Sequence, residues 1–128
     1  MKEFESKIVE ASRELSAKEK IAIKNATNCV TLDNALNDAD SLIITPTGYA
    51  VIAVHNEKAK GDKDYQKYVI LAQDGVMYST GSEAFFRTFR DIWDEMKEEA
   101  PDEEFSIEVF KRPSKNYAGK YFISCNII

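Results

Sequence analysis

A strongly amphipathic segment, residues 83–96, most constrains what this chain can fold into. Its large apolar side chains recur three and four residues apart, and charged side chains take the opposite side; the apolar stripe consists of Phe85, Phe86, Phe89, Ile92, Trp93 and Met96. The tetrapeptide 80–83 has a capping-box pattern, in which the Thr80 oxygen caps the helix and Glu83 reaches back. We therefore predict a helix over 80–96 whose aromatic side is buried in the core.

Segments on both sides of this helix have the alternation and the β-branched content of strands. The Asp74-Gly75 pair marks a tight hairpin between two of them. The expected strands are 20–24, extended by 29–32, then 41–45 and 49–55 with a bend at Gly48, 66–72, 76–79, 104–111 and 120–128. The last three of these strands before the helix, counting the bent 41–55 as one, followed by the helix and two strands, have the order of the OB-fold, a partly open barrel known for binding oligonucleotides and oligosaccharides. We therefore predict a mainly β chain, a five-stranded OB-fold barrel with a helix between strands 3 and 4.

The first segment predicts an additional, N-terminal helix. Residues 2–15 place Phe4, Ile8, Ala11 and Leu15 four and three residues apart, with charges between them. Such a helix packs on its own barrel, docks on a neighbouring subunit or remains a partly ordered tail, and periodicity leaves all three open. No repeat or linker-like stretch divides the chain, so we expect one domain over 1–128, in which 1–16 are a helical extension.

The charge of the chain is unevenly distributed. Its net charge is −5, which taken alone argues against nucleic acid as a partner. Residues 91–104, however, contain eight acids and one base, so the rest of the chain carries a net charge of +2. This acidic run is interpreted as a solvated surface, as a segment that recruits replication proteins, or as one that repels wrongly placed DNA.

Composition and motifs argue against an enzyme. The chain has no glycine-rich phosphate loop, no nucleophile-elbow serine and a single histidine. Two cysteines and one histidine are too few for a zinc site, so we expect free thiols at Cys29 and Cys125, no metal and no cofactor. No apolar run approaches the ~20 residues that span a bilayer, and the charged N-terminus lacks the apolar stretch of a secretory signal. We expect a cytoplasmic protein without membrane contact.

Two segments combine basic side chains with tyrosines, 58–68 and 111–121. Binding of a single strand without sequence preference needs a positive groove for phosphates and aromatic faces for bases. We therefore predict DNA contacts in both segments, with Tyr65 and Tyr117 as stacking residues; the full set is Lys58, Lys60, Lys63, Tyr65, Lys67, Lys111, Arg112, Lys115, Tyr117, Lys120 and Tyr121. The alternative is that these loops are simply solvated and that their tyrosines cover the edge of the core.

Other aromatic residues leave two interpretations open. Tyr49, Tyr68 and Tyr121 lie in predicted strands, where alternation turns each of them either to the core or to the groove. His55 follows a strand and is either an ordinary strand-end residue or a base-stacking one.

The block from Tyr68 to Ser82 carries a family resemblance. A strand leads into the sequence AQDGVMYS at 72–79 and then directly into the helix, which resembles the small OB-fold single-stranded DNA-binding proteins of protein-primed bacteriophages and Gram-positive conjugative plasmids. Weaker likeness runs from Ile21 through 25–27 and over 119–124, whereas the extension 1–16 and the acidic helix exit depart from the family. The resemblance implies a protein of the bacterial cytoplasm that acts in phage or plasmid DNA replication or transfer.

Residues and resemblance together predict a sequence-independent single-stranded DNA-binding protein, which stacks bases on tyrosines and contacts phosphates from basic loops. The expected partners are single-stranded DNA, replication proteins and a second copy through the N-terminal helix. Because fold does not fix function, the alternatives are an OB-fold protein-interaction module and a mobile-element regulator without DNA binding.

Overall fold

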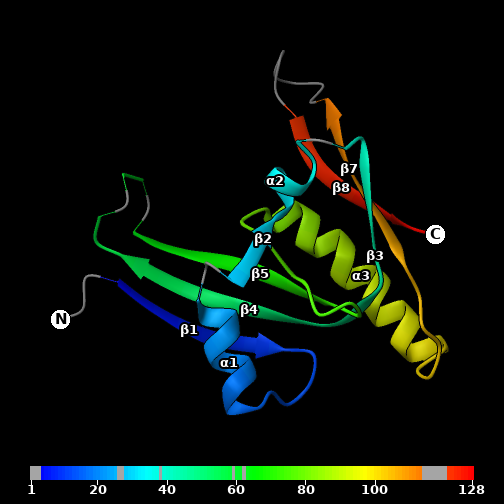
Figure 1. Cartoon of the computed structure of the whole chain (residues 1–128), viewed down its shortest axis with the longest axis horizontal. Helices are drawn as coiled ribbons and strands as arrows, with labels where there is room; N and C mark the ends of the chain where they lie inside the picture. The colour runs from blue at the N-terminus through cyan, green and yellow to red at the C-terminus, as the bar shows by residue number, and fades with distance from the viewer. Residues whose placement is uncertain (1–3, 26–27, 38, 59, 62, 114–120) are drawn as a thin grey trace.

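A computed structural model of the chain describes residues 4–25, 28–37, 39–58, 60–61, 63–113 and 121–128 (Figure 1). The elements follow in the order β1 (Phe4–Ala11), α1 (Ala17–Lys24), β2 (Cys29–Thr31), α2 (Leu32–Ala35), β3 (Ser41–Ile44), β4 (Pro46–Asn56), β5 (Asp64–Ala72), β6 (Met77–Thr80), α3 (Glu83–Glu99), β7 (Ile107–Pro113) and β8 (Tyr121–Ile127). The expectation of a mainly β chain with one long helix after the hairpin is confirmed.

The described strands form two sheets and no closed barrel, in place of the single five-stranded barrel predicted. One sheet has the order β1-β4-β5-β6-β2 and the other the order β3-β7-β8. All pairings are antiparallel except that of β2 with β6. Because β5 and β2 occupy the two edges of β6, that strand has no edge left for β8, which prevents closure.

The two sheets are joined where β3 passes into β4. A single residue, Thr45, separates the two strands, and Pro46 cannot donate a ladder hydrogen bond. The Thr45 and Ser106 hydroxyls lie 2.6 Å apart, and the Thr45 carbonyl accepts from the Gln73 amide at 2.9 Å. The bend therefore lets one length of chain pair with β7 before it and with β5 after it.

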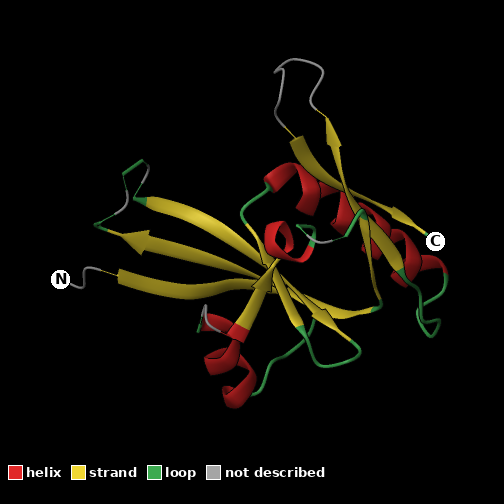
Figure 2. Ribbon diagram, turned by 45° about the horizontal axis from the view of Figure 1, so that its top comes forward, coloured by secondary structure: helices red, strands yellow, loops and turns green. Residues whose placement is uncertain are grey.

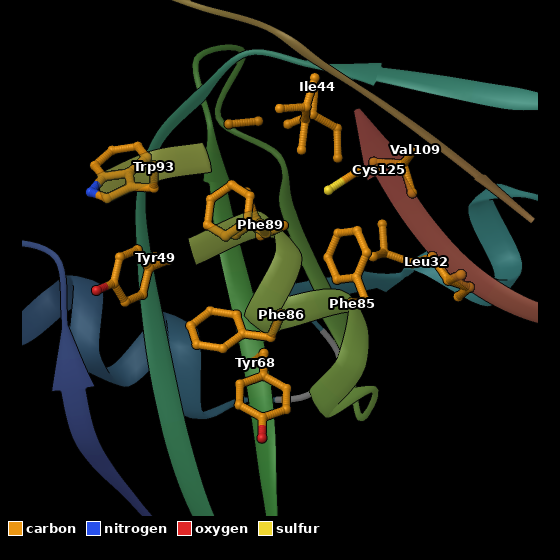
Figure 3. Packing of buried hydrophobic residues seen from close by; sticks show 14 of the residues in the cluster. Leu32, Ile44, Tyr49, Tyr68, Phe85, Phe86, Phe89, Trp93, Val109 and Cys125 are labelled. Carbon is orange, nitrogen blue, oxygen red and sulfur yellow. The ribbon is translucent and has the colours of Figure 1, made fainter. Parts of the chain in front are cut away.

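The aromatic stripe of α3 fills the space between the sheets, as predicted. Phe85, Phe86, Phe89 and Trp93 are all buried, and Figure 3 shows them facing the strands. Phe86 stacks on Tyr68 with ring centroids 4.4 Å apart, and Tyr49 meets the helix aromatics edge-on. Tyr49 and Tyr68 thus belong to the core, which resolves the two interpretations of these strand residues.

The cap of α3 lies two residues later than predicted. The Ser82 hydroxyl accepts from the Phe85 amide at 3.1 Å, so Ser82 and not Thr80 is the N-cap. The Thr80 hydroxyl instead accepts from the Ser82 amide at 3.1 Å. Both residue types suit a cap, and Thr80 is held in β6 by its pairing with Tyr68.

The N-terminal helix prediction is wrong, because residues 4–11 form strand β1 along β4. The register shifts between Ile8 and Glu10. This bulge adds one residue to the strand, so Ile8 and Ala11, three apart, both pack on the same side of the sheet. A bulged strand therefore imitates the spacing of a helical stripe. Residues 1–3 lie outside the described part of the chain.

The segment predicted as the first strand, 20–24, is instead the end of helix α1. The helix begins with a capping box in which the Ser16 hydroxyl accepts from the Glu19 amide and the Glu19 carboxylate accepts from the Ser16 amide. Arg13 adds two hydrogen bonds to the same carboxylate, at 2.7 and 3.2 Å. Local capping outweighs the β propensity of two isoleucines here. Ile23 is buried, while Ile21 faces solvent.

A second, smaller cluster lies under α1, on the side of the large sheet away from α3. It contains Leu15 and Ile23 together with side chains of β4 and β5. Beyond the helices, β1, β4 and β5 continue as a three-stranded arm, residues 4–8, 52–56 and 64–67 (Figure 2).

No helix in the described part of the chain has the length and apolar character needed to cross a membrane.

We predict that Leu32→Ala lowers the free energy of unfolding by about 2–5 kcal/mol. Leu32 is fully buried among residues of both sheets, so its removal leaves a cavity beside β6. Urea titration followed by circular dichroism measures the change. Ile21→Ala is the matched control, because Ile21 is 70% exposed and should alter stability by no more than about 0.5 kcal/mol. Equal effects of the two changes would show that α2 is not part of the core.

We predict that Glu19→Gln lowers the melting temperature at pH 7 and that the difference from wild type disappears in acid. The hydrogen bonds from Arg13 and then from the Ser16 amide lower the pKa of Glu19 from 4.5 to about 2. The folded state therefore gains stability from the ionised carboxylate above pH 4.5 and loses it as the pH falls through about 2. Melting curves from pH 7 to pH 2 test this, with Glu14→Gln as a control of equal charge change. A pH-independent difference would contradict it.

Candidate nucleic-acid interface

The first predicted segment lies at the tip of the arm, where β4 turns into β5. Tyr65 and Lys67 stand opposite Val54 and Ile52 on one face of the sheet. Tyr65 is 41% exposed, whereas Lys67 is half-buried. Lys58 and Lys60 lie exposed in the connection between the strands. The structure thus leaves an aromatic face and several cations together at this tip.

Part of that positive charge is paired within the tip itself. Glu57 places one carboxylate oxygen 2.6 Å from His55 Nε2 and the other 3.1 Å from Lys63 Nζ. The second imidazole nitrogen, Nδ1, lies 2.7 Å from Asp64. The hydrogen bonds that the ring donates to these carboxylates, to Asp64 first and then to Glu57, raise the pKa of His55. His55 is therefore an ion-paired residue, and the strand-end and base-stacking interpretations both missed this role.

The arm tip also contains an open hollow of about 450 Å³. Ala53, a residue with a small side chain, is part of its lining. Lys7, His55, Tyr65 and Gln66 are among the residues around it. The hollow therefore brings a cation, an imidazole and an amide to one face of the arm, whereas the Tyr65 side chain belongs to the other face.

The second predicted segment begins at the end of β7 and resumes at the start of β8. Lys111 and Arg112 are exposed on β7, and Tyr121, opposite Pro113, is 67% exposed. Tyr121 therefore faces solvent rather than the core. Lys115, Tyr117 and Lys120, including one of the two predicted stacking residues, lie outside the described residues.

The outer face of β7 and β8 holds aromatic residues that the sequence prediction did not select. The Arg112 guanidinium lies 4.9 Å from the centre of the Phe110 ring, and Arg112 stands opposite Phe122 in the register. Phe122 is 45% exposed, and Phe110 is half-buried. Their neighbours Val109 and Ile123 point into the core instead. We call Phe110, Arg112 and Phe122 the stacking face.

A signal for this face was present in the alternation of β7. Ile107 and Val109 take the core side, which assigns Phe110 and Arg112 to the solvent side. A large aromatic residue at a solvent-side position is a candidate contact residue.

The two predicted segments do not meet. Figures 1 and 2 show the β4–β5 tip and the ends of β7 and β8 at separate places on the molecule. The acidic run is distant from the stacking face, because it ends where β7 begins, and Arg112 lies near the other end of that strand. A seven-residue strand spans roughly 20 Å. Basic and acidic surfaces are therefore well separated.

The described side chains bring no group of three or more potential ligands into position to hold a metal ion. Cys29 and Cys125 carry free thiols, and burial raises the pKa of Cys125 to about 11.

No protein-family model, curated protein or solved structure matches the chain. The functional assignment therefore depends on the geometry of these surfaces.

Proposed function

We propose that this protein binds single-stranded DNA without sequence preference and that the stacking face is its principal contact surface. The observation that carries this proposal is the combination of Phe110, Arg112 and Phe122 on the outer face of the sheet. Aromatic side chains exposed on strands, with a cation between them, are the means by which proteins hold unpaired bases.

The register places these groups at a spacing that suits stacking. Arg112 and Phe122 are direct cross-strand partners, while Phe110 pairs with Ser124 and is therefore diagonal to Phe122. Diagonal neighbours lie about 7–8 Å apart, within reach of aromatic side chains. Arg112, held over the Phe110 ring, can contribute both a cation–π interaction with a base and a charge for a phosphate.

The charge around the stacking face supports a phosphate backbone as the ligand. Lys111 precedes Arg112 on β7, and the sequence from 114 to 120 adds Lys115 and Lys120 without any acid. The acidic run lies at the other end of β7, where it does not compete for the same strand of DNA. A negative net charge is therefore compatible with a positive binding surface.

We propose further that the strands are arranged as a modified OB-fold. If β3 and β4 are counted as one bent strand, neighbouring strands pair in the order β8, β7, β3/β4, β5 and β6. In the chain, α3 lies between β6 and β7. Both features support the OB-fold order of five strands with one helix after the third. A barrel built on this order would close between β6 and β8, where β2 instead covers β6. The connections β4–β5 and β7–β8 would then correspond to the two loops that OB-folds use for oligonucleotides.

The resemblance of the 68–82 block to phage and plasmid single-stranded DNA-binding proteins supports a role in DNA replication or transfer in the bacterial cytoplasm. Coating a transient single strand requires no catalytic group, which agrees with a binding surface made of stacking and ionic contacts.

We predict that the wild-type protein binds a fluorescent oligo-dT at low salt and that Phe122→Ala weakens this binding roughly fivefold to hundredfold. The loss reflects one stacking surface, and fluorescence anisotropy measures it. Ile43→Ala is the control, because Ile43 is 57% exposed on the same sheet face but has no π face. No binding in the micromolar range at low salt would overturn the proposal.

The second candidate function is that of a protein-interaction module, and the variants Phe122→Ala and Ile43→Ala test it as well. Ile43 is exposed on the same face of the sheet as the stacking face. Exposed apolar side chains that lie together are typical of protein-docking surfaces. If neither variant alters DNA binding, and both weaken one stoichiometric protein complex, the chain is a protein-interaction module instead.

We predict that Arg112→Gln makes DNA affinity less dependent on salt. Each phosphate contact of a single strand contributes a slope of about −0.7 to log K against log [salt], so the variant should lose roughly that amount. Titrations at four salt concentrations measure the slope. Lys97→Gln removes the same charge from the acidic end, where Lys97 lies 4.7 Å from the Trp93 ring centre, and should leave the slope unchanged. Equal slopes in all three proteins would exclude a phosphate contact at Arg112.

A further inference from the structure

We infer that His55 and Lys63 form a phosphate site at the tip of the arm and that Glu57 holds this site as an intramolecular competitor of DNA. The inference rests on the proposed function, since the phosphate in question belongs to the bound strand. It adds a second contact surface, distant from the stacking face, and a residue that limits its affinity.

The geometry of Glu57 is that of an anion bound between two cations. Its two oxygens are divided, one on His55 Nε2 at 2.6 Å and one on Lys63 Nζ at 3.1 Å. A phosphate group also presents several oxygens to separate donors, and charge-assisted contacts of this kind are short and favourable. The two donors are therefore already positioned for an anion with more than one oxygen.

Asp64 prepares His55 for this role. It lies 2.7 Å from Nδ1, on the opposite side of the ring from Glu57. A carboxylate on one imidazole nitrogen favours the protonated ring, which then directs an N–H group outward from the other nitrogen. If a phosphate replaces Glu57, Asp64 remains in place and continues to support the positive charge.

The contacts of Glu57 are weak enough to be displaced. His55, Glu57 and Lys63 have side chains that are 31%, 36% and 52% exposed. Ion pairs with this exposure contribute little net stability because water screens them. The pairing therefore neutralises the tip without locking it, so that a polyanion can exchange with Glu57.

The hollow beside this group points to a nucleotide rather than to a free anion. His55, Asp64 and Tyr65 all line the hollow of about 450 Å³, a volume within the range of small-molecule sites. Tyr65 is 41% exposed and follows Asp64 in β5. Its side chain therefore faces the other side of the sheet from His55 and Asp64, and the hollow itself is the space beside the two cations that a nucleotide can enter.

The experiment compares Glu57→Gln with the wild type in binding to fluorescent oligo-dT. Loss of the competing carboxylate should tighten binding roughly twofold to fivefold at low salt and steepen the salt slope by about 0.7. Glu98→Gln is the matched control, because it changes the charge equally at the exposed end of α3 and should have a smaller effect. Melting curves show that each variant is folded.

A second variant tests whether the gain passes through the imidazole. In the double variant with His55→Gln, the gain from Glu57→Gln should shrink, because only Lys63 is then released. The wild type should also bind more tightly at pH 6 than at pH 8, as the ring gains its proton, and His55→Gln should lose this dependence. The charged groups that face or adjoin the ring in strand register, in the hollow or in the turn are Glu5, Lys7, Glu57, Lys63 and Asp64.

The outcomes separate this inference from the proposed function. If the wild type binds DNA and Glu57→Gln binds no more tightly, or if Glu98→Gln produces the same gain, the competitor role is overturned while the proposed function stands. If the wild type does not bind at all, the proposed function fails and the phosphate site fails with it. A gain that depends on His55 supports both.

Discussion

The rest of the structure depends on the aromatic packing between α3 and the large sheet. Phe86 stacks on Tyr68, and Tyr49 contacts three helix aromatics edge-on, so one side of the helix supplies the aromatic centre of the larger core cluster (Figure 3). Aromatic side chains bury 150–250 Å² each and prefer these edge and offset geometries. The same cluster includes Val109 and Ile123 of the small sheet. Both hairpins that carry the candidate contacts are therefore held by a single helix.

This arrangement leaves strand ends and one sheet face available for contacts. The β2–α2 segment fills the opening between the sheets, where Leu32 and Leu36 are buried. Because Val109 and Ile123 point into the core, β7 and β8 have an outer face that no other described element covers (Figure 1). The length of β7 that separates the acidic run 91–104 from Lys111 and Arg112 then allows a protein of negative net charge to expose basic side chains at the far end of this strand.

The sequence predicted α3, its buried side and most of the strands after residue 40, because strong periodicity and the Asp74-Gly75 turn are local signals. The predictions for the segments before residue 25 were wrong. A β-bulge at Ile8–Glu10 imitated helical spacing, and the Ser16–Glu19 capping box overcame the β propensity of the next isoleucines. In the candidate site, Phe122 was missed since only the fold shows which strand faces remain uncovered.

By itself, the sequence determined the amphipathic helix, the uneven charge and the presence of two basic, tyrosine-bearing segments, all of which follow from residue order and spacing. Only the tertiary structure decided which of those residues remain available. It buried Tyr68, paired Lys63 with Glu57, and set Arg112 over Phe110. The physical reason is that strand register and the packing of α3 select the exposed face of each strand, and register is a property of two distant segments rather than of one.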